Sequence, residues 1–540
     1  MAGQQQPGSG GRSATTSPAA PPPLLQELWR TGAWRLFPLL LVYMSGITLL
    51  IPHVPGIMTD YFAGRRAGRP GDLHCEFLPA DAPRIDADAC RDAHADVVLW
   101  SSWTSFFSNS LVSIVLTPLL GHWSDLHGRK PFILVAQGCA CIPLLIVLLH
   151  LTSGVSLLWY YVVQIFISAV SSVTVAIAFC ADLLCQRNRA ATFGLIMACF
   201  SIAVFVGPAT GAALDPLTAC LAALGTVAGC ALYTLLILPE SLSDDARVAA
   251  RRRHLESQRE RHGHHHGAGG PPTWRVALSS TLGAVRILLR SPLFKRLTLV
   301  MMLTGVVLEG LQDLLVQYLQ LKLEGFGVRD VSHIFMIFGG CGLLVQTLLL
   351  RVLLNWLGEQ RVLLVALAAS AIQQLILAMA GAKWVAFLGI SLGSLGSMSF
   401  PTISSIKSNN AQEHEQGSVQ GALYGARALA SGTGPLVFAF LFAAFTRTES
   451  PLPFFPGAPF LFGFALMLLA IGITATIPST AGGSGGSIER RQQQQQQQQC
   501  QAASPVGPAE PLGSEAKPGG DVEGGLGEEE LTSERSRLLS

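Results

Sequence analysis

One pattern of small residues occurs twice in this chain, and the two copies stand 227 positions apart. The repeated residues are Gly194, Ala203, Gly207 and Pro208 in the first half and Gly421, Ala430, Gly434 and Pro435 in the second. Both copies lie in long apolar segments. Many secondary transporters are built from repeated halves of this kind, with a substrate site between the repeats near the middle of the membrane. The repeat therefore predicts two similar halves and favours a carrier.

The composition places both halves in a lipid bilayer. Half of the residues are hydrophobic, the mean hydropathy is +0.44 and only 13% of the residues are charged, whereas ordinary soluble domains are roughly one quarter charged. A membrane-spanning helix needs about 20 apolar residues, and the sequence predicts twelve such segments. They cover residues 36–58, 97–120, 131–151, 156–181, 191–213, 217–238, 296–320, 331–353, 361–381, 384–406, 417–445 and 457–478.

These segments predict an all-α membrane protein in which twelve transmembrane helices form two pseudo-symmetric six-helix bundles. The predicted parts are a disordered N-terminal tail (1–34), a first bundle (35–240), a His/Arg-rich cytoplasmic linker (241–294), a second bundle (295–480) and a disordered C-terminal tail (481–540). The tails are rich in Gly, Pro, Ser and Gln, a composition that cannot bury a core.

The basic residues of the short connections predict the orientation. Residues on one side include Arg129, Lys130, Arg187, Arg189, Arg351, Arg361 and Lys407, whereas the connections after segments three, five and nine hold only Lys383. Because basic residues favour the cytoplasmic side, we expect both termini there. The first apolar segment is too long for a cleaved secretory signal and is interpreted as a retained span.

A very short turn joins segments two and three. It contains Gly121, Asp125, Gly128, Arg129 and Lys130. Glycines let the two helix ends approach closely, and the Asp125 carboxylate can face a helix N-terminus or a neighbouring arginine. We interpret these five residues as a gating loop. An ordinary tight and basic connection is the alternative.

The repeated small residues predict a second functional feature, a pair of helix-packing hinges. Those in the fifth segment are Gly194, Gly207, Pro208 and Gly211, and those in the eleventh are Gly421, Gly434 and Pro435. Small residues permit close helix contact in lipid, and proline frees backbone groups that a neighbouring helix must satisfy. The alternative is a packing face without any part in transport.

Ionisable residues inside apolar segments are functional-site candidates by default. Glu309, Gln312 and Asp313 share one face of the seventh segment, Arg427 lies in the eleventh, and Asp182 lies near the cytoplasmic end of the fourth. A carboxylate at mid-depth can bind a proton or a cation, and Arg427 can neutralise it or hold an anionic substrate. The alternatives are a structural ion pair between helices and, for Asp313, a position near the exofacial surface.

Cys75 and Cys90 lie in the exofacial loop predicted over 59–96. An oxidising compartment permits a disulfide between them, and two unpaired thiols are the alternative. The linker histidines are His262, His264, His265 and His266. They form a weak metal candidate, since a flexible loop supplies no fixed ligand geometry, and a solvated linker is the other interpretation. We expect no cofactor.

The tail and linker also suggest partners. Glu534, Leu538 and Leu539 have the spacing of an acidic dileucine sorting signal, which predicts clathrin-adaptor binding and an endosomal, lysosomal or vacuolar membrane, with the plasma membrane as the alternative. The basic run over 247–261 can contact anionic lipid. No folded nucleic-acid-binding module accompanies it, so we expect no nucleic-acid partner.

The turn at 121–130, with Pro131 after it, resembles the loop signature of the major facilitator superfamily. Within that superfamily the chain resembles the hippocampus-abundant-transcript-like, tetracycline-resistance-like group over about residues 35–480. The residues that carry this resemblance are Ser124, Asp125, Gly128, Arg129, Lys130, Ala181, Asp182, Pro239, Glu240, Ser241, Glu309, Gln312, Phe400, Pro401, Gln416, Gly417, Gln420, Gly421, Arg427, Gly434, Pro435, Pro456, Gly457, Pro459 and Gly463.

The resemblance implies a twelve-span solute carrier, but it does not supply a substrate. Two hallmarks of drug–proton antiporters in the superfamily are incomplete. Ala203 and Ala212 replace glycines of the fifth-helix signature, and residues 159–164 of the fourth segment hold no arginine. The resemblance therefore does not extend to proton-coupled drug export.

We expect a secondary active transporter that moves a small solute by alternating access, coupled to an ion or proton gradient. The sequence has no Gly-rich phosphate loop ending in Lys-Ser/Thr for ATP, and no nucleophile–base or metalloenzyme pattern, so an enzyme is not expected. The alternative is a non-transporting membrane scaffold or trafficking receptor. In that case loss of Leu538 and Leu539 would matter more than changes at Glu309 or Arg427.

Overall fold

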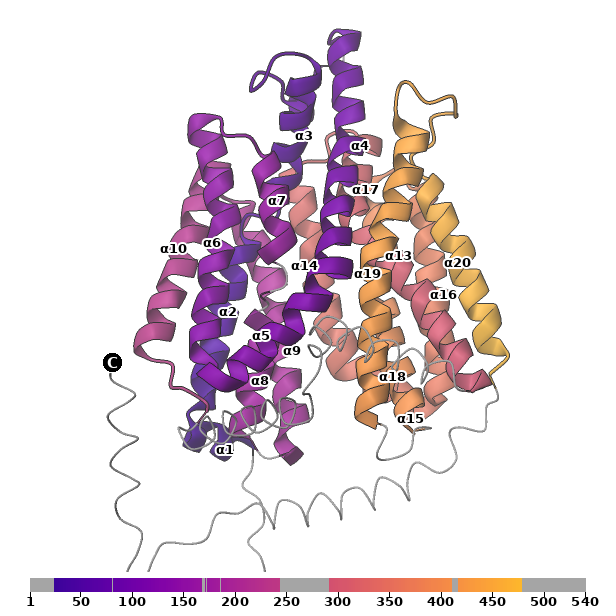
Figure 1. Cartoon of the computed structure of the whole chain (residues 1–540). Helices are drawn as coiled ribbons and strands as arrows, with labels where there is room; N and C mark the ends of the chain where they lie inside the picture. The colour runs from indigo at the N-terminus through magenta and orange to yellow at the C-terminus, as the bar shows by residue number, and fades with distance from the viewer. Residues whose placement is uncertain are drawn as a thin grey trace, which may run out of the picture.

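The computed structural model describes residues 24–79, 81–167, 170, 172–184, 186–242, 291–409 and 416–477. These residues form helices and connecting turns without a strand, and the helices make two bundles that lie side by side (Figure 1). The predicted all-α fold with two bundles is confirmed.

The first bundle contains ten α-helices. They are α1 (Leu24–Thr31), α2 (Leu36–Thr48), α3 (Val54–Arg66), α4 (Arg84–Phe106), α5 (Ser113–His127), α6 (Lys130–Ser153), α7 (Leu158–Ile167), α8 (Ser172–Leu183), α9 (Gln186–Gly211) and α10 (Pro216–Leu236). Short 3-10 turns, η1 (Ala33–Arg35) and η2 (Cys75–Phe77), precede α2 and α4.

The second bundle repeats the plan, and its longest helices, α13 and α19, have 31 residues each. They are α13 (Pro292–Lys322), α14 (Val328–Leu344), α15 (Leu350–Leu357), α16 (Glu359–Met379), α17 (Lys383–Gly393), α18 (Ser399–Asn409), α19 (Gln416–Thr446) and α20 (Ala458–Ala475). A 3-10 turn, η5 (Ser394–Met398), joins α17 to α18.

A π-helical turn interrupts the corresponding span in each bundle. η3 (Phe107–Val112) joins α4 to α5, and η4 (Val345–Leu349) joins α14 to α15. π-helical turns are rare in proteins overall, but those that occur are often found at functional sites. Their equivalent positions agree with the repeat seen in the sequence.

Each predicted apolar segment coincides with helical structure, but the number of spans is not settled by length. Nine helices of the described residues are long and apolar enough to cross a bilayer, or ten when the pair α4 and α5, bent by 48°, counts as one span. Shorter apolar helices cover Ala33–Thr48, Leu158–Ile167 and Thr174–Leu183. Twelve spans therefore remain a prediction.

The exofacial connection predicted over 59–96 is helical for most of its length. α3 continues to Arg66 and α4 already begins at Arg84. Both extensions are held by burial, because Phe62 of α3 and Ala89 and Ala93 of α4 pack into the core of the first bundle. The apolar face of each helix thus continues after its sequence has become polar overall.

We call the end of the molecule that carries Cys75 and Cys90 the disulfide end. The opposite end, where α10 stops and α13 begins, is the linker end (Figure 1).

Two pairs of helices make the most extensive contacts between the bundles. α9 packs on α14, and α4 packs on α19. Ala95 and Val98 of α4 are fully buried within the core of the second bundle. α4 is therefore a first-bundle helix whose half near the disulfide end is built into the interface.

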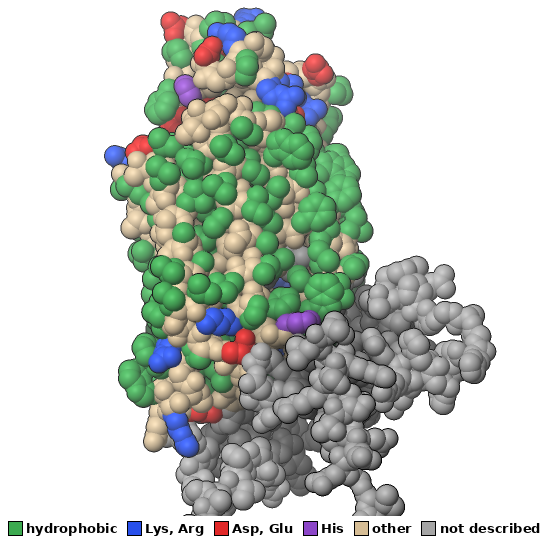
Figure 2. All heavy atoms as spheres, turned by 60° about the vertical axis from the view of Figure 1, so that its left-hand side comes forward, with side chains coloured by type: hydrophobic (Ala, Val, Ile, Leu, Met, Phe, Trp, Pro, Cys, Tyr) green, Lys and Arg blue, Asp and Glu red, His purple; other side chains and the backbone are tan. Residues whose placement is uncertain are grey.

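The outer surface suits lipid. Figure 2 shows hydrophobic side chains over the middle of one face and charged side chains toward its two ends. Large apolar side chains remain exposed on both bundles, among them Trp159, Leu221, Leu235, Trp356, Trp384 and Leu388. A band of this kind would aggregate in water, but it is stable in a bilayer.

Candidate functional site

The centre of the molecule holds a carboxylate that links the two bundles. Ser105 of α4 donates a hydrogen bond to the Asp313 carboxylate of α13, and the two oxygens lie 2.9 Å apart. Asp313 has no cationic partner within the described residues. It faces a cavity of ≈ 190 Å³ whose other lining residues are Ser101, Thr104, Ser105, Ser108, Asn109, Tyr160, Tyr161 and Gln164.

A second carboxylate, one helical turn away, has a different environment. Arg427 of α19 lies 3.2 Å from Glu309 of α13, and Gln312 and Ser431 each donate a hydrogen bond of 3.3 Å to the same carboxylate. The Arg427 guanidinium also lies over the ring of Phe400, 4.8 Å from its centroid. Because the Arg427 side chain is 45% exposed, this ion pair is partly screened by solvent.

The Glu309 cluster also reaches the first bundle. Asn109 of η3 donates to the Ser431 hydroxyl across 3.1 Å, and Ser431 in turn donates to Glu309. Two carboxylates and one guanidinium thus lie close together. Asp313 is connected to α4 by one hydrogen bond, and Glu309 is connected to η3 by two, through Ser431. A proton or a cation bound here would change contacts between the bundles.

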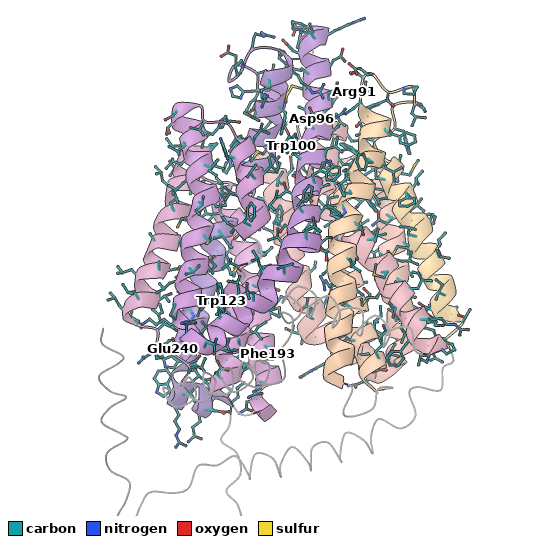
Figure 3. The ribbon with its side chains drawn as sticks, viewed as in Figure 1. Arg91, Asp96, Trp100, Trp123, Phe193 and Glu240 are labelled. Atoms are coloured by element: carbon teal, nitrogen blue, oxygen red, sulfur yellow. A yellow bond between two sulfur atoms is a disulfide. The ribbon has the colours of Figure 1, made fainter. Side chains whose placement is uncertain are left out.

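The disulfide end is closed by charged groups from both bundles. Arg66 of α3 binds Asp92 and Asp96 of α4, and Arg447, just after α19, lies 2.8 Å from Asp96. Thr448 donates both its backbone N–H and its hydroxyl to Asp92, each across 2.9 Å. Figure 3 shows Asp96 on α4 toward this end of the molecule. These contacts tie the second bundle to α4.

Arg91 adds one more tie at the same end. Its Nε donates to the backbone carbonyl of Thr446 across 2.6 Å, and its guanidinium lies 4.0 Å from the ring centroid of Phe454. In Figure 3, Arg91 lies beyond Asp96 toward the tip of α4. We call the contacts of Arg66, Arg91, Asp92, Asp96, Arg447 and Thr448 the outer clasp.

A buried polar group lies beneath the outer clasp. Gln317 of α13 accepts hydrogen bonds at Oε1 from Thr59 of α3, at 3.0 Å, and from Nδ1 of His94 of α4, at 2.6 Å. The Gln317 amide donates to the carbonyl of Pro55. The side chains of Thr59, His94 and Gln317 are all buried, so hydrogen bonds join the two bundles inside the interface as well as at its rim.

Cys75 and Cys90 form a disulfide with their Cα atoms 5.6 Å apart, and it places Glu76 against the second bundle. The Glu76 carboxylate lies beside Gly327 and close to the backbone N–H of Val328, the first residue of α14. Burial raises the pKa of Glu76 above its ordinary value, and the charges of Asp60 and Asp330 act in the same direction. The Val328 N–H and His53 oppose this rise.

The sequence-predicted gating loop lies at the linker end. Gly128 has φ of 102°, a conformation that favours glycine, and the Glu240 carboxylate accepts from the backbone N–H groups of Arg129 and Lys130. The Arg129 side chain binds Asp125 and Asp182. Burial alone would lower the pKa of Arg129, but the hydrogen bond to Asp182 and both carboxylate charges raise it.

Asp182 therefore does not face the central cavity, and it belongs to this loop. Ser241 also donates to it. Figure 3 shows Trp123 and Glu240 at the linker end of the first bundle. The nearby groups of the second bundle pair among themselves, as Ser405 with Glu359 and Lys407 with Thr298.

Three of the predicted hinge glycines lie at helix crossings inside a bundle. A Cβ at Gly207 would collide with α2, one at Gly211 with Leu49 directly after α2, and one at Gly434 would lie 2.5 Å from the Val306 carbonyl of α13. Gly194 has no neighbouring atom within 4 Å of such a Cβ. Pro208 and Pro435 lie in the same helices, and the neighbours of Gly421 are outside the described contacts. Their role as hinges stays a prediction.

Sequence reasoning missed the glycines between the bundles. A Cβ at Gly339 of α14 would lie 2.5 Å from the Ser201 carbonyl of α9, and one at Gly432 of α19 would overlap Ser110 of η3. It also missed Ser105 and Asn109, whose signal was a set of polar residues in an otherwise apolar segment. The outer clasp was missed because Arg66, Asp92 and Asp96 fell in the predicted loop.

Several predicted sites lie outside the described residues. These are the linker histidines His262, His264, His265 and His266 and the tail signal Glu534, Leu538 and Leu539. Within the described ranges, no group of three or more His, Cys, Asp or Glu residues has a geometry that could hold a metal ion.

Comparison with known families gives a match over most of the chain. The family model of the Major Facilitator Superfamily matches residues 36–435. Mouse hippocampus abundant transcript 1 protein is 26% identical over 396 residues, which cover 68% of this chain and 75% of that protein. The class G tetracycline resistance protein of Vibrio anguillarum is 27% identical over 341 residues, covering 62% and 79%.

Solved structures show the same fold. The human organic anion transporter MFSD10 (TETRAN) aligns with a TM-score of 0.53 and 22% identity over 84% of this chain and 100% of its own. A D-xylose-proton symporter aligns with a TM-score of 0.53 and 14% identity, covering 84% and 99%. At these identities the alignments speak for the fold alone.

Proposed function

Because this chain belongs to the major facilitator superfamily, we propose that it is a secondary active transporter that moves a small solute by alternating access and couples that movement to protons. Family membership supports membrane transport. The proton is proposed from the central site, where Asp313 faces a polar cavity without a cationic partner among the described residues.

The contact between Asp313 and Ser105 is the observation that carries the coupling. The ionised carboxylate accepts the Ser105 hydroxyl, and this bond joins α13 to α4. A proton on Asp313 removes the charge that strengthens the bond. Protonation therefore weakens one tie between the bundles, and a solute that displaces the proton restores it.

Glu309 and Arg427 supply a second element of the site, an ion pair. Arg427 offsets the charge of Glu309, so this pair keeps one side of the site electrically neutral while Asp313 changes its charge. A solute with a carboxylate or an amine can exchange with one member of the pair. We propose that Gln312 and Ser431 hold Glu309 in position during that exchange.

The arrangement supports a state that is closed at the disulfide end. The outer clasp, the Gln317 group and Glu76 all join the bundles there. The charged groups of the linker end described above pair within their own bundle. We propose that the bundles rock so that the clasp opens when the solute is released or taken up on that side.

The sidedness and the compartment are proposed from the sequence. The basic residues of the short connections favour a cytoplasmic linker end, so the disulfide end is exofacial or lumenal. Disulfides persist in such oxidising compartments. We propose that Glu534, Leu538 and Leu539 bind clathrin adaptors and direct the protein to endosomal or lysosomal membranes.

The test separates coupling from binding. Purified protein in proteoliposomes would be offered a solute library with and without an imposed pH gradient. For a transported solute, Asp313→Asn should abolish accumulation against the gradient, while exchange of labelled for unlabelled solute persists, at a higher solute concentration where the solute is a cation that binds Asp313. Glu324→Gln, just after α13 and exposed, is the matched control. If Asp313→Asn accumulates the solute as the wild type does, protons are not coupled through Asp313.

A further inference from the structure

A second cavity opens on the side of the first bundle. It has a volume of ≈ 450 Å³ and lies along α4 and α7. Its walls include Trp100, Trp103 and Phe107, whose side chains are 41%, 40% and 39% exposed. Asp96 and Arg447 form its rim at the disulfide end. We call this space the aromatic groove, and it faces the surface where the bilayer lies.

The aromatic groove and the central cavity share a wall. Thr104 and Tyr161 line both spaces. Tyr161 is only 3% exposed, and its hydroxyl makes no hydrogen bond of normal geometry to the described residues, although Ser101 lies close by. A buried phenol without a partner loses a hydrogen bond that it had in water. Because it lies at the junction of two cavities, this hydroxyl is available to a ligand that occupies them.

The charges around these spaces define that ligand. At the rim, Asp96 is paired with both Arg66 and Arg447, so the rim offers no unpaired charge. The Asp313 carboxylate is the unpaired charge that lines the central cavity within the described residues. Asp313 and Tyr161 line the same cavity. The matching ligand group is therefore positive.

The walls define the rest of the ligand. Three aromatic side chains line the aromatic groove, and indole and phenyl faces bind both apolar rings and cations. A volume of this size lies within the usual range for small-molecule sites, about 300–1,000 Å³. The complementary molecule has a flat apolar body and one protonated amine.

We propose that the aromatic groove and the central cavity together bind an amphipathic amine, with its ring system among Trp100, Trp103 and Phe107 and its ammonium group between Asp313 and the Tyr161 hydroxyl. The ammonium N–H donates to the carboxylate and to the phenol oxygen. This assignment rests on the proposed function only in naming the class of solute, since binding itself requires no gradient. Molecules of this class concentrate in bilayers, from which the exposed groove is accessible.

Equilibrium binding of tritiated desipramine, a tricyclic secondary amine whose protonated nitrogen carries two N–H groups, to the full chain in nanodiscs tests the proposal, with empty nanodiscs subtracted. The wild type should bind the amine at least about tenfold more tightly than iminodibenzyl, the neutral ring system without the amine. A carboxylate on the same rings should not compete. Equal competition by the neutral or acidic compound would overturn the proposal.

Three variants locate the site. Asp313→Asn and Trp103→Ala should each weaken amine binding about tenfold, and Tyr161→Phe about threefold or more. Trp384→Ala, at an indole 69% exposed on α17 of the other bundle, should leave the affinity unchanged. Thermal unfolding of each variant confirms that it is folded. If folded Trp103→Ala and Tyr161→Phe bind the amine as the wild type does, the ligand does not occupy the groove.

The result is independent of proton coupling. Amine binding with this variant pattern, without any effect of a pH gradient on transport, would support the site and contradict the proposed coupling. Gradient-driven transport of another solute, without amine binding, would support the coupling and overturn the site.

Discussion

The substitution Asp92→Asn should open the disulfide end. Asp92 is 6% exposed and accepts two hydrogen bonds of 2.9 Å from Thr448, together with a 3.3 Å contact from Arg66. The asparagine keeps the shape and one acceptor oxygen, but it loses the charge and presents an N–H to groups that are themselves donors. At least one charged hydrogen bond across the bundles is lost.

The magnitude follows from those contacts. A hydrogen bond to a charged group contributes about 1.5–3 kcal/mol. Arg66 and Asp92 both lie in the first bundle, so their contact is common to the closed and the open state and adds nothing to the difference. A loss of about 1.5–3 kcal/mol from the closed state changes the ratio of closed to open molecules by about 13- to 160-fold.

Hydrogen exchange measures this change directly, because the Thr448 amide N–H is one of the bonds in question. In the Asp92→Asn protein, exchange of this amide should accelerate by about the same factor. Asp88→Asn, on an exposed residue one turn earlier in α4, should not change it. Amides of α6 report on global unfolding. Thr448 exchange within about twofold of the wild type in Asp92→Asn would refute the role of Asp92 in holding the clasp.

Three further predictions concern packing, pH and the linker-end loop. Gly207→Ala would place a Cβ 2.7 Å from the Ser45 carbonyl and should cost about 1–3 kcal/mol of stability. Gly194→Ala has no such neighbour and should leave thermal unfolding unchanged. Equal effects of the two substitutions would contradict the close crossing of α9 and α2. Because burial raises the pKa of Glu76, the closed state binds a proton at this carboxyl more tightly than a state in which Glu76 is solvated. Acidification through this pKa therefore favours the closed state, and this stabilisation is lost as the pH rises. Exchange of the Val328 amide should show this pH dependence, and Glu76→Gln should remove it. Arg129→Lys and Asp182→Asn should show a coupling energy of about 0.5–3 kcal/mol in a double-mutant cycle of thermal stability. The reason is that lysine lacks the planar guanidinium that binds both Asp125 and Asp182. Additive effects of the two substitutions would show that the contact between Arg129 and Asp182 is not energetically significant.

The membrane fold was predictable because its signals are long and periodic. Apolar segments and the repeated Gly207–Pro208 and Gly434–Pro435 pairs indicated two similar bundles, and both the family match and the structural alignments agree. The central residues were also accessible to reasoning, since Glu309, Asp313 and Arg427 are charges in apolar surroundings. Sequence spacing could not show that Arg427 pairs with Glu309 while Asp313 instead contacts Ser105.

The contacts at the disulfide end could not be predicted in the same way. Arg66, Asp92 and Asp96 lie in a stretch whose composition is that of a soluble loop, and hydropathy gives no reason to expect helices there. Their helices form because one face is buried against neighbours distant in the sequence, such as α19 and the residues after it. Asp182 shows the converse, since its charge in an apolar segment made it a candidate for transport, whereas the structure pairs it with Arg129 of the linker-end loop.

The most direct test of the account is a pair of distances measured in the same membrane. Spin labels at Arg65 and Leu452 report on the disulfide end, and labels at Trp123 and Trp356 report on the linker end; all four positions are exposed. Cys75 and Cys90 are kept, and the remaining cysteines are replaced. Rocking of the bundles predicts that a pH change or a transported solute lengthens one distance while it shortens the other. Distances that do not change, or that lengthen together, would contradict alternating access.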